Sequence, residues 1–311
     1  MSDSSRPVRD APGWAAHRAA WLSVAVSVLL LVIATQVPVP ALAATDRALA
    51  LRTTYAALRE PLRVNPYGRP LVIASTETPD RLTGNIHAVV PHAFDQVRRA
   101  LSDPAHWCDV ISLHINTKYC RAQSGPDGPM LRVFVGKKTP EELATASRVD
   151  FAYRVSANTP AYFDTVLLAK DGPLGTSDYR IALEAVAVPG DKTFIHLTYS
   201  YSYNFAGRLA MLAYLSTVGS DKVGFSRAPD AGSDSSALVG GMRGLVERNA
   251  MRYYLALDTY LEHDAPDQMN QRLQAWFRAT EQYPRQLHEV DGAAYMAMKQ
   301  AEFQRQQDVP N

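Results

Sequence analysis

Polar and apolar residues alternate with a period of two through much of the region from Val110 to Tyr203. Successive side chains of a strand point to opposite faces, so such runs predict strands with one apolar and one solvated face. Turn sequences such as SGPDG, KDGPLG and VPGDK separate the runs. The pattern predicts about six successive strands in an antiparallel meander. The predicted strands are centred on residues 111–115, 131–135, 149–155, 160–170, 179–185 and 195–203.

Helical spacing flanks this meander on both sides. Two further strands, LVIASTE at residues 71–77 and NIHAVV at residues 85–90, precede a helix in which Phe94, Val97 and Leu101 share one face. A much longer helix follows the meander, and two shorter ones follow that helix. The predicted helices cover residues 45–62, 91–103, 204–219, 237–263, 268–280 and 291–307.

The apolar face of such a sheet must be covered, and the long helix at residues 237–263 is the available cover. A strongly twisted sheet that wraps around one helix leaves a concave, apolar volume of the kind that small molecules occupy. We therefore expect an α+β fold, with a curved antiparallel sheet around a long C-terminal helix and a cavity between them.

The stretch GNIHAVVPHAFDQVRRALSDPAHWCDV, residues 84–110, resembles the opening of the START-like (SRPBCC) superfamily: a strand, a short helix and a tryptophan before the meander. That family also ends with a long C-terminal helix gripped by the sheet, and the resemblance covers residues 84–263. It implies a helix-grip fold with a deep hydrophobic cavity for lipids, sterols, polyketides or other apolar ligands. Some members are carriers, and others are cyclases or hydrolases. This chain departs from the simple pattern by having extra helices at both ends and a helix at residues 204–219.

The apolar faces of the predicted strands and the inward side of the long helix supply the candidate ligand-binding residues. They are Ile111, Leu113, Leu131, Val133, Phe151, Tyr153, Tyr179, Ile181, Leu183, Tyr199, Tyr201, Leu245, Asn249, Tyr253 and Leu257. The tyrosines and Asn249 have two interpretations. They orient a ligand head group or polarise a carbonyl, or they are core residues whose polar atoms reach solvent or backbone partners. Arg248 and Arg252 fit a solvated helix face as well as a pair with an acidic ligand, and they are not counted in the site.

The chain carries none of the common catalytic signatures, such as G-x-S-x-G, G-x-G-x-x-G, the phosphate loop or H-E-x-x-H. His87, His114 and His196 fall opposite the apolar faces if the alternation holds, which predicts solvated strand residues. We assign no catalytic residue, cofactor or metal site from the sequence. The helix at residues 204–219 fits a lid, a segment that dips into a membrane surface, or simple packing on the core.

The favoured function is therefore the binding of a lipid or other hydrophobic small molecule without catalysis. An enzyme of the cyclase or hydrolase type, acting on a lipophilic substrate, is the first alternative, and it predicts ionisable groups that converge in the cavity. The second alternative is an interaction protein with a filled core. The 311 residues have a formal net charge of +1 and no stripe of lysine or arginine, which argues against a nucleic-acid partner.

The N-terminal region has the three parts of a secretory signal. Arg6, Arg9 and Arg18 precede an apolar run at residues 19–34, and the small-residue pattern Ala41-Leu42-Ala43 follows. The alternative is an uncleaved membrane anchor, because the run approaches the roughly 20 residues that span a bilayer. Both readings place the rest of the chain outside the cytoplasm, in the periplasm or tethered to the outer face of the cytoplasmic membrane. The expected segments are a leader or anchor at 1–43, a helix and strand at 44–83, the START-like domain at 84–263 and a helical extension at 264–311.

Cys108 and Cys120 are the only cysteines of the chain. In an exported protein they are expected to form a disulfide, which contributes about 3 kcal/mol in the chain-entropy model. Two free buried thiols and a metal site with His106 and His114 are the alternatives. The spacing lacks the C-x2-C knuckle of compact zinc sites.

Overall fold

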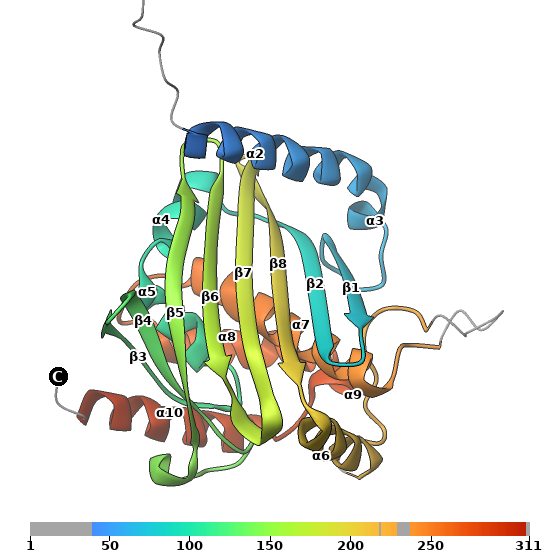
Figure 1. Cartoon of the computed structure of the whole chain (residues 1–311), viewed down its shortest axis with the longest axis vertical. Coiled ribbons are helices and arrows are strands. Elements are labelled where there is room, and N and C mark those ends of the chain that lie inside the picture. Colours follow the sequence, from blue (N-terminus) through green and yellow to red (C-terminus); the bar gives the residue numbers. More distant parts are fainter. Residues whose placement is uncertain (1–38, 218, 229–236, 309–311) are drawn as a thin grey trace, which may run out of the picture. The chain divides into compact units, whose positions relative to one another are not determined.

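One antiparallel sheet organises the chain (Figure 1). The computed structural model describes residues 39–217, 219–228 and 237–308. Within these residues, eight strands pair in the order β1-β2-β8-β7-β6-β5-β4-β3. The strands are β1 (Leu71–Glu77), β2 (Arg81–Val90), β3 (Thr117–Gly125), β4 (Gly128–Val135), β5 (Ser147–Asn158), β6 (Phe163–Asp171), β7 (Thr176–Val188) and β8 (Lys192–Tyr203).

Helices precede the sheet, interrupt it once and follow it. The predicted leader lies outside the described residues except for its last five residues, which begin α2. None of the helices in the described part of the chain is long and apolar enough to cross a membrane. The helices are α2 (Val39–Ala57), α3 (Arg59–Arg63), α4 (Phe94–Leu101), α5 (Pro104–Ser112), α6 (Phe205–Ser216), α7 (Gly241–Glu262), α8 (Met269–Glu281), α9 (Pro284–Leu287) and α10 (Gly292–Asp308), with single turns η1 (Leu143–Thr145) and η2 (Pro173–Gly175).

The strand pairing confirms the expected fold class. β3 to β8 form the predicted meander, and β2 pairs along its whole length with β8, which brings the β1–β2 hairpin into the same sheet. α4 and α5 connect β2 to β3, which lies at the far edge of the sheet from β1. α7 covers the concave side, and Figure 1 shows α7 and α8 behind the strands. This arrangement is an α+β helix-grip fold.

One predicted strand is wrong. Residues 110–116 do not form a strand, because α5 continues to Ser112 and a turn leads into β3 at Thr117. The side chain of Asp103 accepts a hydrogen bond from the backbone N–H of Ala105 at 2.8 Å, and Pro104 occupies the first helical position. Both features favour the start of a helix. The apparent alternation at Ile111, Leu113 and Ile115 comes from a helix end and a turn.

The close approach of α7 to β2 depends on Gly84. A Cβ atom at this position would lie 3.1 Å from the Cβ of Ala250 and 3.2 Å from the carbonyl oxygen of Val246. Ala250 and Val246 are completely buried. Contacts this short leave no room for a larger side chain unless the helix moves away from the sheet. Gly84 therefore fixes the distance between α7 and the strand it covers.

Replacing Gly84 is expected to destabilise the protein in proportion to the size of the new side chain. Gly84→Val should lower the free energy of unfolding by about 2 kcal/mol, and Gly84→Ala should lower it less, because overpacking forces the helix outward. Strand propensity alone predicts the opposite order, since valine favours strands. Urea unfolding of the two variants distinguishes these outcomes. A valine variant as stable as the wild type contradicts the close-approach argument.

The helices after α7 pack into the main core. Trp276 of α8 and Tyr295 of α10 are buried there, and the hydroxyl of Tyr295 donates to the backbone oxygen of Leu113 at 2.9 Å. Lys118 of β3 forms a buried ion pair with Glu302 of α10 at 2.9 Å. The described residues from Ala44 onward therefore form one compact unit.

The opposite face of the sheet is partly covered by α2. Ala48 packs in a second cluster with Phe194, which lies next to the core residue Ile195 and so faces the other side of the sheet. Arg47 and Asp164 form an ion pair at 2.6 Å beside this cluster. The N-terminal helix therefore stabilises the sheet from outside the grip.

Cys108 and Cys120 form a disulfide in the structure, with their Cα atoms 5.2 Å apart. The bond joins α5 to β3, and both sulfur-bearing residues are buried. No cluster of metal-ligating side chains is found in the described part of the chain. The disulfide therefore fixes one end of the helical connection that crosses from β2 to the far edge of the sheet.

The double substitution Cys108→Ser and Cys120→Ser is expected to lower the free energy of unfolding by about 3 kcal/mol, because the unfolded chain loses a cross-link. Denaturant unfolding of the oxidised wild type and of the double variant measures the difference. The reduced wild type serves as the control and should match the variant. Equal midpoints for the oxidised protein and the variant contradict the prediction.

Candidate functional site

A cavity of about 160 Å³ lies on the concave side of the sheet. α7 approaches β1, β2 and β8 most closely, whereas α5 packs on β3 and β4. Side chains of both helices reach the cavity, Ile111 from α5 and Asn249 and Tyr253 from α7. The cavity is lined by Ile111, His114, Asn116, Thr117, Val133, Val135, Val149, Phe151, Pro173, Tyr179, Ile181, Tyr199, Asn249 and Tyr253.

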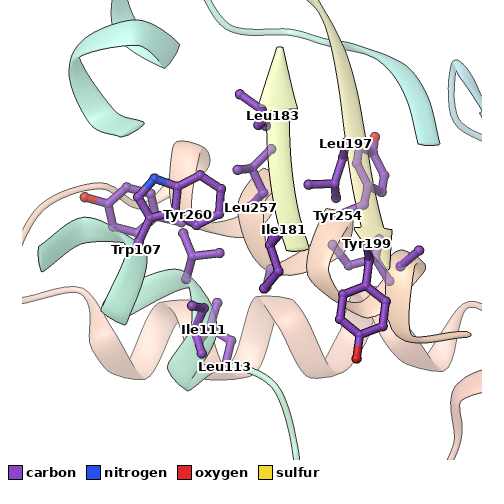
Figure 2. Close-up of a cluster of buried hydrophobic side chains, with 14 of the residues drawn as sticks. Trp107, Ile111, Leu113, Ile181, Leu183, Leu197, Tyr199, Tyr254, Leu257 and Tyr260 are labelled. Carbon is purple, nitrogen blue, oxygen red and sulfur yellow. The ribbon is translucent and has the colours of Figure 1, made fainter. Parts of the chain in front are cut away.

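Eight of the predicted site residues line this cavity, and six others are buried in the main core without lining it. Those that line the cavity are Ile111, Val133, Phe151, Tyr179, Ile181, Tyr199, Asn249 and Tyr253. Others are buried in the main core: Leu113, Leu131, Tyr153, Leu183, Tyr201 and Leu257. Leu245 is half-buried and belongs to neither set. Figure 2 shows Trp107 and Ile111 of α5, Leu183 of β7 and Leu257 of α7 in the cluster of buried hydrophobic side chains. Contact with a ligand stays a prediction for the lining residues.

Six lining residues were not predicted. Val135 and Val149 continue the apolar faces of β4 and β5, so the alternation of these strands could have identified them. Pro173 belongs to the η2 turn, and three residues lie where α5 ends and β3 begins: His114, Asn116 and Thr117. The mistaken strand at residues 110–116 concealed His114 and Asn116, and Thr117 follows it directly as the first residue of β3. No signal in the sequence marks the η2 turn with Pro173 as part of a cavity.

His114 is buried, contrary to the prediction that it is a solvated strand residue. The backbone N–H of Asn116 donates to its Nδ1 at 3.2 Å, and the ring stacks on Tyr253 with centroids 4.9 Å apart. Burial lowers the pKa of His114 well below its ordinary value, and the charges of Arg252 and Lys299 act in the same direction. The imidazole is therefore neutral, with its proton on Nε2. Nε2 forms no hydrogen bond within the described residues.

The other two histidines do lie on the face opposite the core, as predicted, but they are half-buried rather than solvated. His87 and His196 stack there with ring centroids 4.2 Å apart. His196 is flanked by the carboxylate of Glu184 and the side-chain oxygen of Asn85. This pair lies on the other side of the sheet from the cavity.

Asn249 is held by a buried charge network. Nη1 of Arg252 donates to its Oδ1 at 3.3 Å, and Nη2 of Arg252 pairs with Glu289 at 2.5 Å. Lys138 also pairs with Glu289, at 2.8 Å. Arg252 is only 2% exposed, so the interpretation of Arg252 as part of a solvated helix face is wrong, and Arg248 is equally buried. Because the carboxamide oxygen of Asn249 is engaged by Arg252, its NH₂ group is directed elsewhere.

The tyrosines of the predicted site fall into two groups. The hydroxyl of Tyr153 donates to the backbone oxygen of Leu101 at 2.8 Å, and that of Tyr179 lies 2.8 Å from Thr176 Oγ1. Within the part of the chain that the structure describes, the hydroxyls of Tyr199 and Tyr253 form no hydrogen bond. Burial raises the pKa of both, so these hydroxyls stay protonated. The cavity therefore presents two uncharged hydroxyls without protein partners.

α6 packs beside the cavity and leaves an exposed apolar surface. Phe205 is 83% exposed and Leu209 is 59% exposed, whereas Met211 packs against the core and lies 3.5 Å from the hydroxyl of Tyr201. The neighbouring η2 turn places Pro173 on the cavity wall. The helix thus combines core packing on one side with exposed apolar side chains on the other.

Comparisons with known proteins find similarity in structure only. No family model matches the chain, and no curated protein matches its sequence. Human StAR-related lipid transfer protein 5 aligns with a TM-score of 0.34 at 10% identity, over 71% of this chain and 97% of its own. A point mutant of norcoclaurine synthase from Thalictrum flavum, in complex with a transition-state analogue, gives a TM-score of 0.34 at 13% identity, over 62% and 100%. An aromatase/cyclase from Streptomyces gives 0.31 at 12% identity, over 66% and 95%.

The START-like resemblance holds at the level of the fold. The element order and strand pairing described above establish it independently of these scores. The three neighbours comprise a transfer protein and two enzymes by name. At these identities the similarity does not transfer a ligand or an activity to this chain.

The burial of neutral His114 predicts a loss of stability in mild acid. The unfolded chain takes up a proton near pH 6.5, whereas the folded state resists it because the pKa of His114 is lowered. The free energy of unfolding should therefore fall as the pH drops below about 6.5, by up to about 1.4 kcal/mol per pH unit from this group. His114→Phe should reduce that slope and leave the pH dependence between pH 7 and 8 unchanged. Urea unfolding across this range measures it, and an unchanged slope contradicts the assignment.

Proposed function

We propose that this protein binds a small hydrophobic molecule in the cavity between the sheet and α7. The observation that carries the proposal is the cavity itself, which is walled by apolar side chains of β4, β5 and β7 and by Asn249 and Tyr253 of α7. If side chains filled this volume, they would make packing contacts that a cavity lacks. A bound apolar guest would restore those contacts and remove its own surface from water, which contributes about 25 cal/mol per Å².

The volume sets the size of the guest. Drug-sized ligands occupy pockets of about 300–1,000 Å³, whereas an apolar cavity of about 150 Å³ accepts a single aromatic ring. The cavity here measures about 160 Å³. The proposed ligand is therefore a compact, ring-sized molecule or the end of a longer lipid. A whole lipid chain would require the helices around the cavity to move outward.

The proposed location is outside the cytoplasm. The Cys108–Cys120 disulfide supports it, because such bonds persist mainly in oxidising compartments. The predicted leader adds a second, sequence-based argument. N-terminal sequencing of the protein recovered from cell fractions tests this part. A start near Ala44 supports cleavage, an intact N-terminus in the membrane fraction supports an anchor, and recovery from the cytoplasm contradicts export.

Catalysis on a lipophilic substrate is the second candidate. The neutral imidazole of His114 on the cavity wall favours it, since a neutral histidine can polarise a carbonyl by donating a hydrogen bond. The ionisable groups of the surrounding network, such as Arg252 and Glu289, are paired with each other and do not line the cavity. Binding without turnover is the simpler account of this lining.

Filling the cavity is expected to abolish binding. Val149→Phe on β5 places a larger apolar side chain in the cavity and should weaken the binding of fluorobenzene at least tenfold, as followed by ¹⁹F NMR of the full-length protein. Val155→Phe is the matched control, because Val155 lies on the same strand but is exposed and outside the cavity. It should leave the affinity within about twofold. No binding to the wild type, or equal binding to both variants, contradicts the proposal.

A further inference from the structure

The polar groups on the cavity wall share one chemical property: they can donate hydrogen bonds. Tyr199 and Tyr253 carry protonated hydroxyls without protein partners in the described part of the chain. Asn249 has its oxygen engaged by Arg252, which leaves its NH₂ group to donate. A ligand that enters the cavity and displaces water from these donors must supply an acceptor, or it leaves them unpaired.

The charged groups around the cavity favour a ligand whose oxygen carries a partial negative charge rather than a full one. No aspartate or glutamate lines the cavity among the described residues, so nothing there would neutralise a cationic ligand. Arg252, Lys138 and Lys299 lie close enough to His114 to lower its pKa. Each of these cations already has a carboxylate partner, Glu289 or Glu302. A full anion in the cavity would therefore lose its hydration without gaining a direct ion pair.

The imidazole of His114 can act only as a hydrogen-bond donor toward the cavity. Its Nδ1 accepts from the backbone N–H of Asn116, so the ring can offer only the Nε2 proton. That proton has no partner among the described residues, so His114 is also a donor on this wall. Arg252 engages Oδ1 of Asn249 and so leaves its NH₂ group free to donate. Arg252 is a positioning residue, whereas Asn249, Tyr199 and Tyr253 are the groups proposed to touch the ligand.

We infer that the cavity binds an uncharged carbonyl compound of about the size of one aromatic ring, whose oxygen accepts hydrogen bonds from Asn249 and from the hydroxyls of Tyr199 and Tyr253. This inference rests on the proposed binding function and adds the ligand class to it. The apolar walls from β4, β5 and β7 hold the ring, and the donors select the carbonyl end. An apolar analogue of the same shape would leave these donors unpaired and should therefore bind more weakly than the carbonyl compound.

Acetophenone and α-methylstyrene test the inference, because they have nearly the same shape and differ in a carbonyl oxygen against a methylene group. Desolvation of the carbonyl opposes its entry into an apolar cavity, so only a donor inside the cavity can reverse the order. The wild-type protein should bind acetophenone about tenfold more tightly than α-methylstyrene, as measured by titration calorimetry or by competition with fluorobenzene. In Asn249→Leu the ratio of the two affinities should fall to about one or below.

Asn158→Leu is the matched control, since Asn158 lies on β5 outside the cavity, and it should retain the tenfold ratio. If Asn249→Leu does not fold, the pair Tyr199→Phe and Tyr253→Phe, each made alone, should reduce the ratio instead. Equal binding of both compounds by the wild type overturns the inference but leaves the proposed function intact. Tighter binding of benzoate than of acetophenone overturns the uncharged ligand class. Binding of none of the compounds overturns the proposed function as well.

Discussion

Burial of α7 on both sides is the constraint on which the rest of the structure depends. One side packs on the sheet, with Gly84 allowing backbone-to-backbone approach. α7 also buries charged side chains, which must therefore be paired. Glu247 accepts from the hydroxyl of Ser75 at 2.6 Å and from the backbone N–H of Phe225 at 2.7 Å. Such a helix cannot leave the sheet without exposing apolar surface and breaking buried polar contacts together.

The cavity follows from how the remaining apolar face is covered. α7 lies closest to one half of the sheet and α5 to the far edge, and the disulfide between Cys108 and Cys120 attaches α5 to β3. Trp107 adds a second attachment, because its indole N–H donates to the backbone oxygen of Leu101 at 3.0 Å and so links α5 to the end of α4. With both covering helices fixed, neither can shift to fill the space that faces β4, β5 and β7. Their side chains and those of the helices enclose a small hollow instead.

Strand periodicity and turn signals were enough to predict the fold, because most strands of the meander alternate, and β6, which is buried on both faces, is still bounded by turn signals. They failed at residues 110–116, where the last turn of α5 and the turn after it imitate a period of two. Four of the fourteen cavity-lining residues, His114, Asn116, Thr117 and Pro173, depended on three-dimensional proximity that no local pattern carries. His114 was assigned to the solvated face by that mistaken strand, and Arg252 seemed solvated because its partner Glu289 lies 37 residues further along the chain. Long-range pairing of charges leaves no periodic signal in a sequence.

Binding and catalysis would share their first step in this cavity. A neutral histidine whose Nδ1 accepts from the backbone can donate a proton to a hydrogen bond, but it cannot remove a proton at Nε2 without changing tautomer. The tyrosines on the wall have raised pKa values and are equally poor bases near neutral pH. The lining described here can therefore hold and polarise a carbonyl, whereas a proton transfer would need a base brought by the ligand or by water. The same donors that select a ligand would determine where charge could develop on it.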